Sequence, residues 1–184
     1  MITLRGWLRM GLANLVTLVR IALIPLFIIL LMKDIQGAYW QAALIFALAA
    51  LTDGLDGYIA RKYNQVTKLG IFLDPLADKL LIIAALVCLA ALQRVPAWIV
   101  VIILSREFLI TCLRAVKAEE GIIIPASRSG KIKTVTQIFA ILIIILSPLY
   151  QAYIAYPVGI WAIYIATVVT VLSGVEYCIK AAAI

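Results

Sequence analysis

The chain has 184 residues, of which 66% are hydrophobic and 14% are charged, and its mean hydropathy is +1.14. A soluble domain is typically about 45–50% apolar and about 25% charged, so this chain has too few polar residues to cover a water-soluble monomer. It has a net charge of +7 and no histidine, which excludes histidine-based triads and histidine metal sites. The composition predicts an all-α integral membrane protein, with residues 1–184 forming a single membrane domain.

Six apolar runs are long enough to cross a bilayer, for which a helix needs about 20 residues. Residues 1–12, which precede the first run, carry arginines opposite apolar side chains, and this predicts a short amphipathic helix on the inner headgroup layer. Of the 16 Lys and Arg, only Lys33 and Arg94 fall in external segments, which predicts that both termini are cytoplasmic and that the chain lies in the cell inner membrane. The expected spans are residues 13–32, 37–60, 71–92, 95–117, 131–149 and 157–179.

Several of these spans contain charged residues. Such residues are costly at membrane depth and are by default a functional hypothesis. Arg20, Asp53, Asp78, Arg106 and Lys133 come from five different expected helices. Counted from the external helix ends, they lie about 15–24 Å from the outer boundary of a hydrocarbon core about 30 Å thick. We therefore expect a water-filled polar cavity that is open to the cytoplasm.

Four aspartates are concentrated in the second and third expected spans. Asp53 and Asp56 are three residues apart and Asp74 and Asp78 are four apart, so each pair shares one helix face. At about 5 Å and an effective dielectric near 20, each pair of carboxylates repels by about 3 kcal/mol. Either some carboxylates are protonated, or cations lie among them. Ligands that are all oxygen favour Mg²⁺ or Mn²⁺, and two such ions suit an in-line displacement at phosphorus.

Around these aspartates the chain reads Asp-x2-Asp-Gly-x2-Ala-Arg-x8-Gly-x3-Asp-x3-Asp, with eight fixed positions over 26 residues. These positions are Asp53, Asp56, Gly57, Ala60, Arg61, Gly70, Asp74 and Asp78. This pattern is the signature of the CDP-alcohol phosphotransferases, and the chain resembles that family. The resemblance implies six transmembrane helices, an interfacial N-terminal helix, a cytoplasm-facing cavity and a homodimer. It also implies transfer of a phosphatidyl group from CDP-diacylglycerol to an alcohol, with release of CMP.

The resemblance further assigns roles to individual residues. Asp53, Asp56 and Asp74 look like metal ligands, and Asp78 looks like the general base that also faces the second metal ion. Contacts to CDP-diacylglycerol are implied for Asn14, Thr17, Gly57, Ala60, Arg61 and Gly70. Taken alone, the small residues at 57 and 60 are equally consistent with close packing between helices. Gly70 is expected to end the loop before the third span.

The second half of the chain bears on the acceptor. With Asn14, Thr17 and Arg20, the stretches 105–108 and 129–134 resemble the phosphatidylglycerophosphate synthase branch of the family, whose acceptor is glycerol 3-phosphate. Cations beside an acidic cluster suit a dianionic acceptor. The acceptor site is therefore predicted at Arg106, Lys131, Lys133 and Thr134.

Two alternatives for these cations stay open. Arg106 could pair with its neighbour Glu107, and the two lysines could anchor their helix at the lipid headgroups. Lys131 and Lys133 also differ by about 200° around a helix, which argues against both facing the cavity.

Other functions would also account for acidic residues within the membrane. Within the same family the acceptor could differ, as in cardiolipin synthase, phosphatidylserine synthase or phosphatidylinositol-phosphate synthase. A divalent-cation transporter would also place carboxylates in the membrane, but transporter sites lie near the midplane on broken helices. The aspartates lie in one leaflet, which favours the enzyme. The expected partners are CDP-diacylglycerol, glycerol 3-phosphate, membrane lipids and a second copy of the chain, with no nucleic acid.

Overall fold

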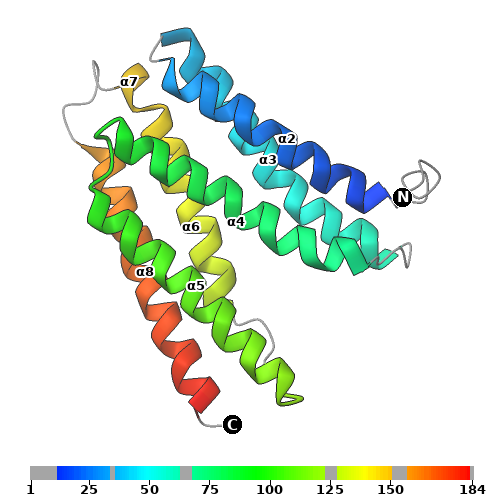
Figure 1. Cartoon of the computed structure of the whole chain (residues 1–184). Helices are drawn as coiled ribbons and strands as arrows, with labels where there is room; N and C mark the ends of the chain where they lie inside the picture. The colour runs from blue at the N-terminus through cyan, green and yellow to red at the C-terminus, as the bar shows by residue number, and fades with distance from the viewer. Residues whose placement is uncertain (1–11, 34–35, 63–67, 123–127, 151–156, 183–184) are drawn as a thin grey trace. The chain divides into compact units, whose positions relative to one another are not determined.

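We describe the protein from a computed structural model, which places residues 12–33, 36–62, 68–122, 128–150 and 157–182. Side chains are described for these residues except 12–16, 36, 53–62, 68–78 and 128. The described residues form helices, with no strand among them (Figure 1). The helices are α2 (Leu12–Met32), α3 (Gln36–Lys62), α4 (Lys68–Ala91), α5 (Ala97–Glu119), α6 (Arg128–Ile145), α7 (Ser147–Tyr150) and α8 (Val158–Ala182). The predicted all-α fold is confirmed for this part of the chain.

Each of the six expected spans coincides with a long helix, but two boundaries differ in an informative way. α4 begins at Lys68, so Gly70 lies in the first turn of the helix and does not end the loop as predicted. The fifth span was expected to continue to residue 149, but α6 ends at Ile145 and α7 follows it. The predicted interfacial helix at residues 1–12 falls almost wholly outside the described residues, which begin at Leu12.

The break between α6 and α7 follows from Pro148. The ring of a proline inside a helix clashes with the carbonyl group four residues earlier, which here belongs to Ile144. As the second residue of the short helix α7, Pro148 is in a first turn, where its missing N–H group is tolerated. The hydroxyl group of Tyr150 donates a hydrogen bond of 3.0 Å to the carbonyl oxygen of Ile143, which ties α7 back to α6.

Only part of the span prediction is supported by apolar length. Among the described residues, α8 is the one helix that is long and apolar enough to cross a membrane. Three further apolar stretches are shorter, Thr17–Met32, Gly37–Thr52 and Lys79–Ala91. Six membrane crossings therefore remain a prediction, although a helix is present at each expected place.

The chain divides into two compact units, Met1–Cys88 and Leu89–Ile184. In the first unit α2 packs along α3 (Figure 1). The rings of Phe27 and Phe46 lie 5.6 Å apart between their centroids, and Ala42 and Ala49 are fully buried. Small residues at a helix interface let two backbones approach closely, so this helix pair is held by contact between complementary surfaces.

In the second unit α8 packs against both α6 and α5. The buried face of α8 changes character along its length. Ile163 and Ala166 are apolar, whereas Thr167, Thr170 and Ser173 are polar and also buried. Polar side chains buried in an apolar helix need hydrogen-bond partners, so this part of α8 marks a polar contact between helices.

A tight turn after α4 opens the second unit. The backbone N–H of Gln93 donates to the carbonyl oxygen of Ala90, and that of Arg94 donates to Leu89, both at 2.9 Å. Gln93 has a φ of +57°, in the left-handed region that such helix ends require and glycine normally occupies. This turn directs the chain from α4 into α5.

Candidate functional site

The four aspartates lie on two consecutive helices of the first unit. Asp53 and Asp56 are one turn apart near the end of α3, and Asp74 and Asp78 are one turn apart in the first half of α4. α4 runs back in the direction opposite to α3 (Figure 1). Asp56 and Asp74 each lie six residues, about 9 Å, from the helix end that borders the connection 63–67. Asp53 and Asp78 both lie about 14–15 Å from those ends. The two pairs thus lie at similar distances along their helices from the connection 63–67.

These four aspartates are the candidate ligands for the predicted metal ions. Their side chains lie outside the described residues, and among the side chains that are described no group of three or more His, Cys, Asp or Glu could hold a metal ion. Four carboxylates on two consecutive helices supply oxygen ligands only, which fits a hard divalent cation such as Mg²⁺ or Mn²⁺. The chemistry of the donor set therefore fits the predicted metal.

The remaining signature residues lie on the same helices. Gly57, Ala60 and Arg61 belong to the last turns of α3, and Gly70 belongs to the first turn of α4. As with the aspartates, contacts of these residues lie outside what the structure describes. The predictions for their roles are neither confirmed nor contradicted.

The beginning of α2 lies at the same end of the first unit as the end of α3 and the beginning of α4 (Figure 1). Asn14 is in the first turn of α2, and its side chain lies outside the described residues. Thr17 is fully buried, and Arg20, one turn further along, is 1% exposed. A buried guanidinium is costly unless it is held by polar groups, so this end of α2 is suited to a polar site and not to plain packing.

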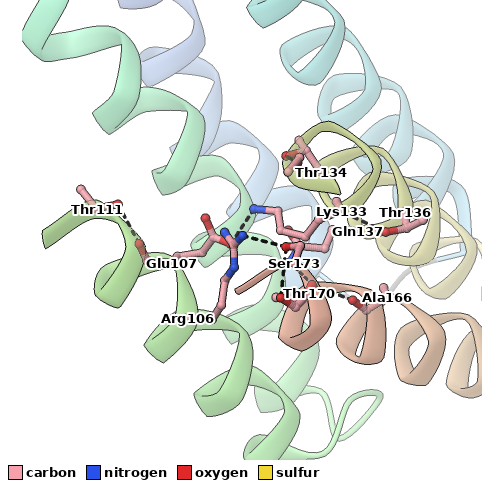
Figure 2. A network of polar contacts seen from close by, with 11 residues as sticks. Arg106, Glu107, Thr111, Lys133, Thr134, Thr136, Gln137, Ala166, Thr170 and Ser173 are labelled. Carbon is pink, nitrogen blue, oxygen red and sulfur yellow. Dashed lines mark hydrogen bonds and ion pairs between the residues drawn. The ribbon is translucent and has the colours of Figure 1, made fainter. Parts of the chain in front are cut away.

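A second polar cluster lies in the second unit, where three helices meet (Figure 2). We call it the polar junction. Its members are Arg106 and Glu107 on α5, Lys133 and Gln137 on α6, and Thr170 and Ser173 on α8. These six residues include two of the four predicted acceptor residues.

The junction is centred on the carboxylate of Glu107. Its Oε1 atom accepts from the Nζ of Lys133 at 2.5 Å and from the Nη1 of Arg106 at 3.3 Å. The side chains of Arg106, Glu107 and Lys133 are 12%, 14% and 8% exposed. Ion pairs this sheltered are screened much less by solvent than surface pairs are. Two cations and one carboxylate leave this group with one net positive charge.

α8 provides the remaining hydrogen-bond partners of the junction. The Nη2 of Arg106 donates to the hydroxyl group of Ser173 at 2.7 Å, and Ser173 donates in turn to the carbonyl oxygen of Thr170 at 3.2 Å. The side-chain amide of Gln137 donates to the hydroxyl group of Thr170 at 2.8 Å, and that hydroxyl donates to Ala166 at 2.6 Å. The Nε of Arg106 is buried without a hydrogen-bond partner among the described residues.

Gly174 gives Arg106 the room to lie across α8. A Cβ atom at position 174 would meet the Cγ of Arg106 at 3.0 Å and its Nε at 3.4 Å. A contact at 3.0 Å is tighter than ordinary van der Waals packing, so a side chain here would push Arg106 away. The absence of a side chain at 174 is therefore part of how Arg106 is placed.

The other two predicted acceptor residues are placed differently. Lys131 is exposed, as expected from its angle to Lys133, and it does not share the buried face of α6. Thr134 is half-buried, and its hydroxyl group donates to the carbonyl oxygen of Gly130 at 3.2 Å. The alternative in which Arg106 pairs with Glu107 is confirmed as a contact, and Lys133 shares the same carboxylate.

Four junction residues were absent from the predicted site, namely Glu107, Gln137, Thr170 and Ser173. A signal for three of them was present in the sequence. Thr167, Thr170 and Ser173 are each one turn apart in a largely apolar run, and Gln137 is one turn after Lys133. Polar residues that share a face of an apolar helix indicate a buried polar contact.

Comparison with known proteins places the chain in a family. A model of the CDP-alcohol phosphatidyltransferase family matches residues 10–172. The CDP-diacylglycerol–glycerol-3-phosphate 3-phosphatidyltransferase of Bacillus subtilis is 44% identical over 182 residues, covering 92% of this chain and 94% of the relative.

Two further relatives agree with this match. A probable phosphatidylglycerophosphate synthase of Mycobacterium tuberculosis is 40% identical over 176 residues, which is 93% of this chain and 81% of the relative. A CDP-diacylglycerol–glycerol-3-phosphate 3-phosphatidyltransferase of Rickettsia prowazekii is 40% identical over 168 residues, or 91% of this chain and 93% of the relative. With the eight signature positions all filled, the chain belongs to the CDP-alcohol phosphatidyltransferase family.

Proposed function

We propose that this protein transfers a phosphatidyl group from CDP-diacylglycerol to glycerol 3-phosphate, giving phosphatidylglycerophosphate and CMP in phospholipid biosynthesis. The observation that carries this function is the similarity, over more than nine-tenths of the chain, to proteins of that name at 35–44% identity. The polar junction adds a physical reason, because a sheltered cluster with a net positive charge suits an acceptor that carries a phosphate.

The aspartates are the proposed metal and catalytic residues. Asp53, Asp56 and Asp74 would bind two divalent ions, Mg²⁺ or Mn²⁺, together with Asp78, and the similar distances of the two pairs from the connection 63–67 support this arrangement. When bound, the two ions neutralise the four carboxylates and stabilise the negative charge that develops on the diphosphate.

The donor is proposed to lie against the same helix ends. Arg61 offers a planar donor fork for a phosphate group, and the small residues Gly57 and Ala60 leave room for the cytidine diphosphate beside α3. Asn14, Thr17 and Gly70 complete the proposed donor site, since the beginnings of α2 and α4 lie at the same end of the unit (Figure 1).

The proposed reaction is one direct displacement. The hydroxyl oxygen of the acceptor forms a bond to the phosphorus that carries the diacylglycerol, and the bond from that phosphorus to the CMP oxygen breaks. Asp78 takes the hydroxyl proton. The chain has no histidine, and its three cysteines, Cys88, Cys112 and Cys178, lie in apolar stretches outside the signature. We therefore expect ternary-complex kinetics, and no release of CMP without the acceptor.

Arg106 and Lys133 are proposed to bind the phosphate of the acceptor. Their nitrogen atoms share one carboxylate oxygen, so they lie less than about 6 Å apart and could contact the same phosphate group. Lys131 and Thr134 were predicted for the same site. The exposure of Lys131 and the backbone contact of Thr134 give them less support.

The membrane arrangement is also a proposal beyond the membrane-embedded character of the family. We propose six crossings by the long helices, an interfacial helix before α2, both termini and the active site on the cytoplasmic side of the inner membrane, and a homodimer. The strongly exposed apolar side chains of α8, among them Trp161, Ile165 and Leu172, support a lipid-facing surface.

One assay tests the function. Purified protein is given CDP-diacylglycerol and Mg²⁺ or Mn²⁺, then glycerol 3-phosphate, serine, inositol phosphate or phosphatidylglycerol in turn, and CMP release is measured. We expect release with glycerol 3-phosphate. Preferential release with another acceptor would assign the chain to a different activity of the family. The absence of release with every acceptor, combined with metal uptake into vesicles, would favour a transporter.

A further inference from the structure

We propose that Glu107 and Ser173 are positioning residues of the acceptor site, which hold Arg106 and Lys133 as a pair and so set the affinity for the phosphorylated acceptor. This inference rests on the proposed function, because it assumes that the two cations bind the acceptor phosphate. It adds two residues to the reaction that the eight-position signature does not contain.

Glu107 acts on both cations through one atom. Its Oε1 accepts from Lys133 on α6 and from Arg106 on its own helix, α5 (Figure 2). Two cations this close repel each other, and the repulsion is strong in a sheltered site. The carboxylate between them offsets that repulsion and fixes their separation before the acceptor arrives. Removing it would let Lys133 and Arg106 move apart.

Ser173 fixes the other arm of the guanidinium. Its hydroxyl group accepts from the Nη2 of Arg106 and donates to the carbonyl oxygen of Thr170, so its one proton is committed to the helix backbone and a lone pair faces the arginine. Gly174 next to it provides the space in which Arg106 lies. Two nitrogens of one planar group are thus held from opposite sides, by α5 and by α8.

Holding the cations in advance matters because binding then loses less side-chain freedom. Lysine and arginine are the side chains that lose most rotamer entropy when they are ordered. A pair that is already ordered gives a tighter site for a doubly charged phosphate, whereas it does little for a donor bound elsewhere. The effect of Glu107 and Ser173 should therefore appear in the KM for glycerol 3-phosphate.

The test compares Glu107→Gln, Glu107→Ala and Ser173→Ala with the unmodified full chain in detergent. Glu120→Gln is the matched control for the glutamate, because Glu120 directly follows α5 and makes an exposed contact with Lys117 at 3.0 Å. Thr167→Val is the control for the hydroxyl, because the hydroxyl group of Thr167 is buried on α8 but donates within its own helix, to the carbonyl oxygen of Ile163. The thermal midpoint of each variant reports whether it is folded.

We expect Glu107→Ala to raise the KM for glycerol 3-phosphate by roughly 10-fold or more and Ser173→Ala by roughly 3- to 10-fold, as losses of contacts to a charged group. Glu107→Gln keeps a hydrogen-bond acceptor, so its KM for glycerol 3-phosphate should lie between that of Glu107→Ala and that of the unmodified protein. The KM for CDP-diacylglycerol should be unchanged in all three variants. The two control variants should keep the KM of the unmodified protein for both substrates. A lower KM for glycerol 3-phosphate in Glu107→Gln would show that the carboxylate competes with the acceptor and would overturn the proposal.

Two more outcomes are decisive. An unchanged acceptor KM in both Glu107→Ala and Ser173→Ala, with the unmodified protein active, would overturn the positioning role while leaving the proposed function intact. Inactivity of the unmodified protein with glycerol 3-phosphate would instead remove the proposed function itself. If Glu107→Ala fails to fold, Ser173→Ala and Glu107→Gln carry the test alone.

Discussion

The two units of the chain place their chemistry in different ways. In the first, the eight signature residues fall within 26 consecutive positions, on the parts of α3 and α4 that flank the connection 63–67. In the second, Glu107 and Lys133 are 26 residues apart and Arg106 and Ser173 are 67 apart, so the polar junction is assembled from three helices. A local site has a fixed spacing that a sequence displays, whereas a site between distant helices has none.

The two sites also differ in how their charges are balanced. The first contains four carboxylates on two consecutive helices, and like charges that lie close together are costly unless some are protonated or cations lie among them. The second carries its own counter-charge in Glu107, so its cations stay paired without a ligand. We therefore expect the first unit to depend on metal and the second to depend on hydrogen-bond geometry.

The largest effect is expected in the first unit. Replacing Asp53, Asp56 or Asp74 with Asn should abolish turnover, because each change removes a proposed metal ligand. The proteins should remain folded, since removing a charge from a repelling cluster does not destabilise it. CMP release and helix content by circular dichroism check both points. Full activity in any of the three variants would contradict the two-metal site.

Metal removal tests the same unit without a mutation. EDTA should abolish CMP release, and added Mg²⁺ or Mn²⁺ should restore it. The polar junction is held by hydrogen bonds and ion pairs between side chains, so the thermal midpoint should change much less than the activity. Activity that survives EDTA would show that the carboxylates work without divalent ions.

A smaller effect is expected at Arg106 in the second unit. Arg106→Gln should lower kcat/KM for glycerol 3-phosphate by roughly 10- to 150-fold, the value of a lost charge-assisted contact. Glu107 keeps Lys133 as a partner in this variant, so the change leaves no isolated buried carboxylate. Arg106→Lys keeps the charge but loses the planar fork, and should have an intermediate effect.

The donor side provides the control for Arg106. The KM for CDP-diacylglycerol should barely change in either variant, because the donor is proposed to bind the first unit. If Arg106→Gln weakened donor binding and left the acceptor KM unchanged, Arg106 would belong to the nucleotide side. The contrast between the two units would then be wrong.

Gly174→Ala should have the smallest effect on activity. The added methyl group meets Arg106 at 3.0 Å and displaces it by a few tenths of an ångström, so the acceptor KM should rise about 2- to 5-fold. Alanine in place of glycine favours a helix by about 1 kcal/mol, so the thermal midpoint should not fall. An unchanged KM would mean that Arg106 adapts freely.

Much of the fold followed from apolar runs, because a span about 20 residues long is set by the bilayer thickness. The apolar run predicts a helix up to residue 149, whereas Pro148 lies inside that run and α6 ends at Ile145. The sequence alone also does not indicate the roles of Ser173 and Glu107. Their significance depends on which helix faces them, and that depends on packing between α5, α6 and α8, which no local spacing encodes.

The turn at Gln93 has a consequence for handling the protein. A residue other than glycine in the left-handed region raises the energy of the folded state by about 1 kcal/mol. Gln93→Gly would relieve that strain at a position outside both proposed sites, although glycine also gains freedom in the unfolded chain. We expect a thermal midpoint that is equal or slightly higher, measured in detergent, with unchanged CMP release. A membrane enzyme with such a turn offers a starting point for stabilised variants that survive purification without any change to their chemistry.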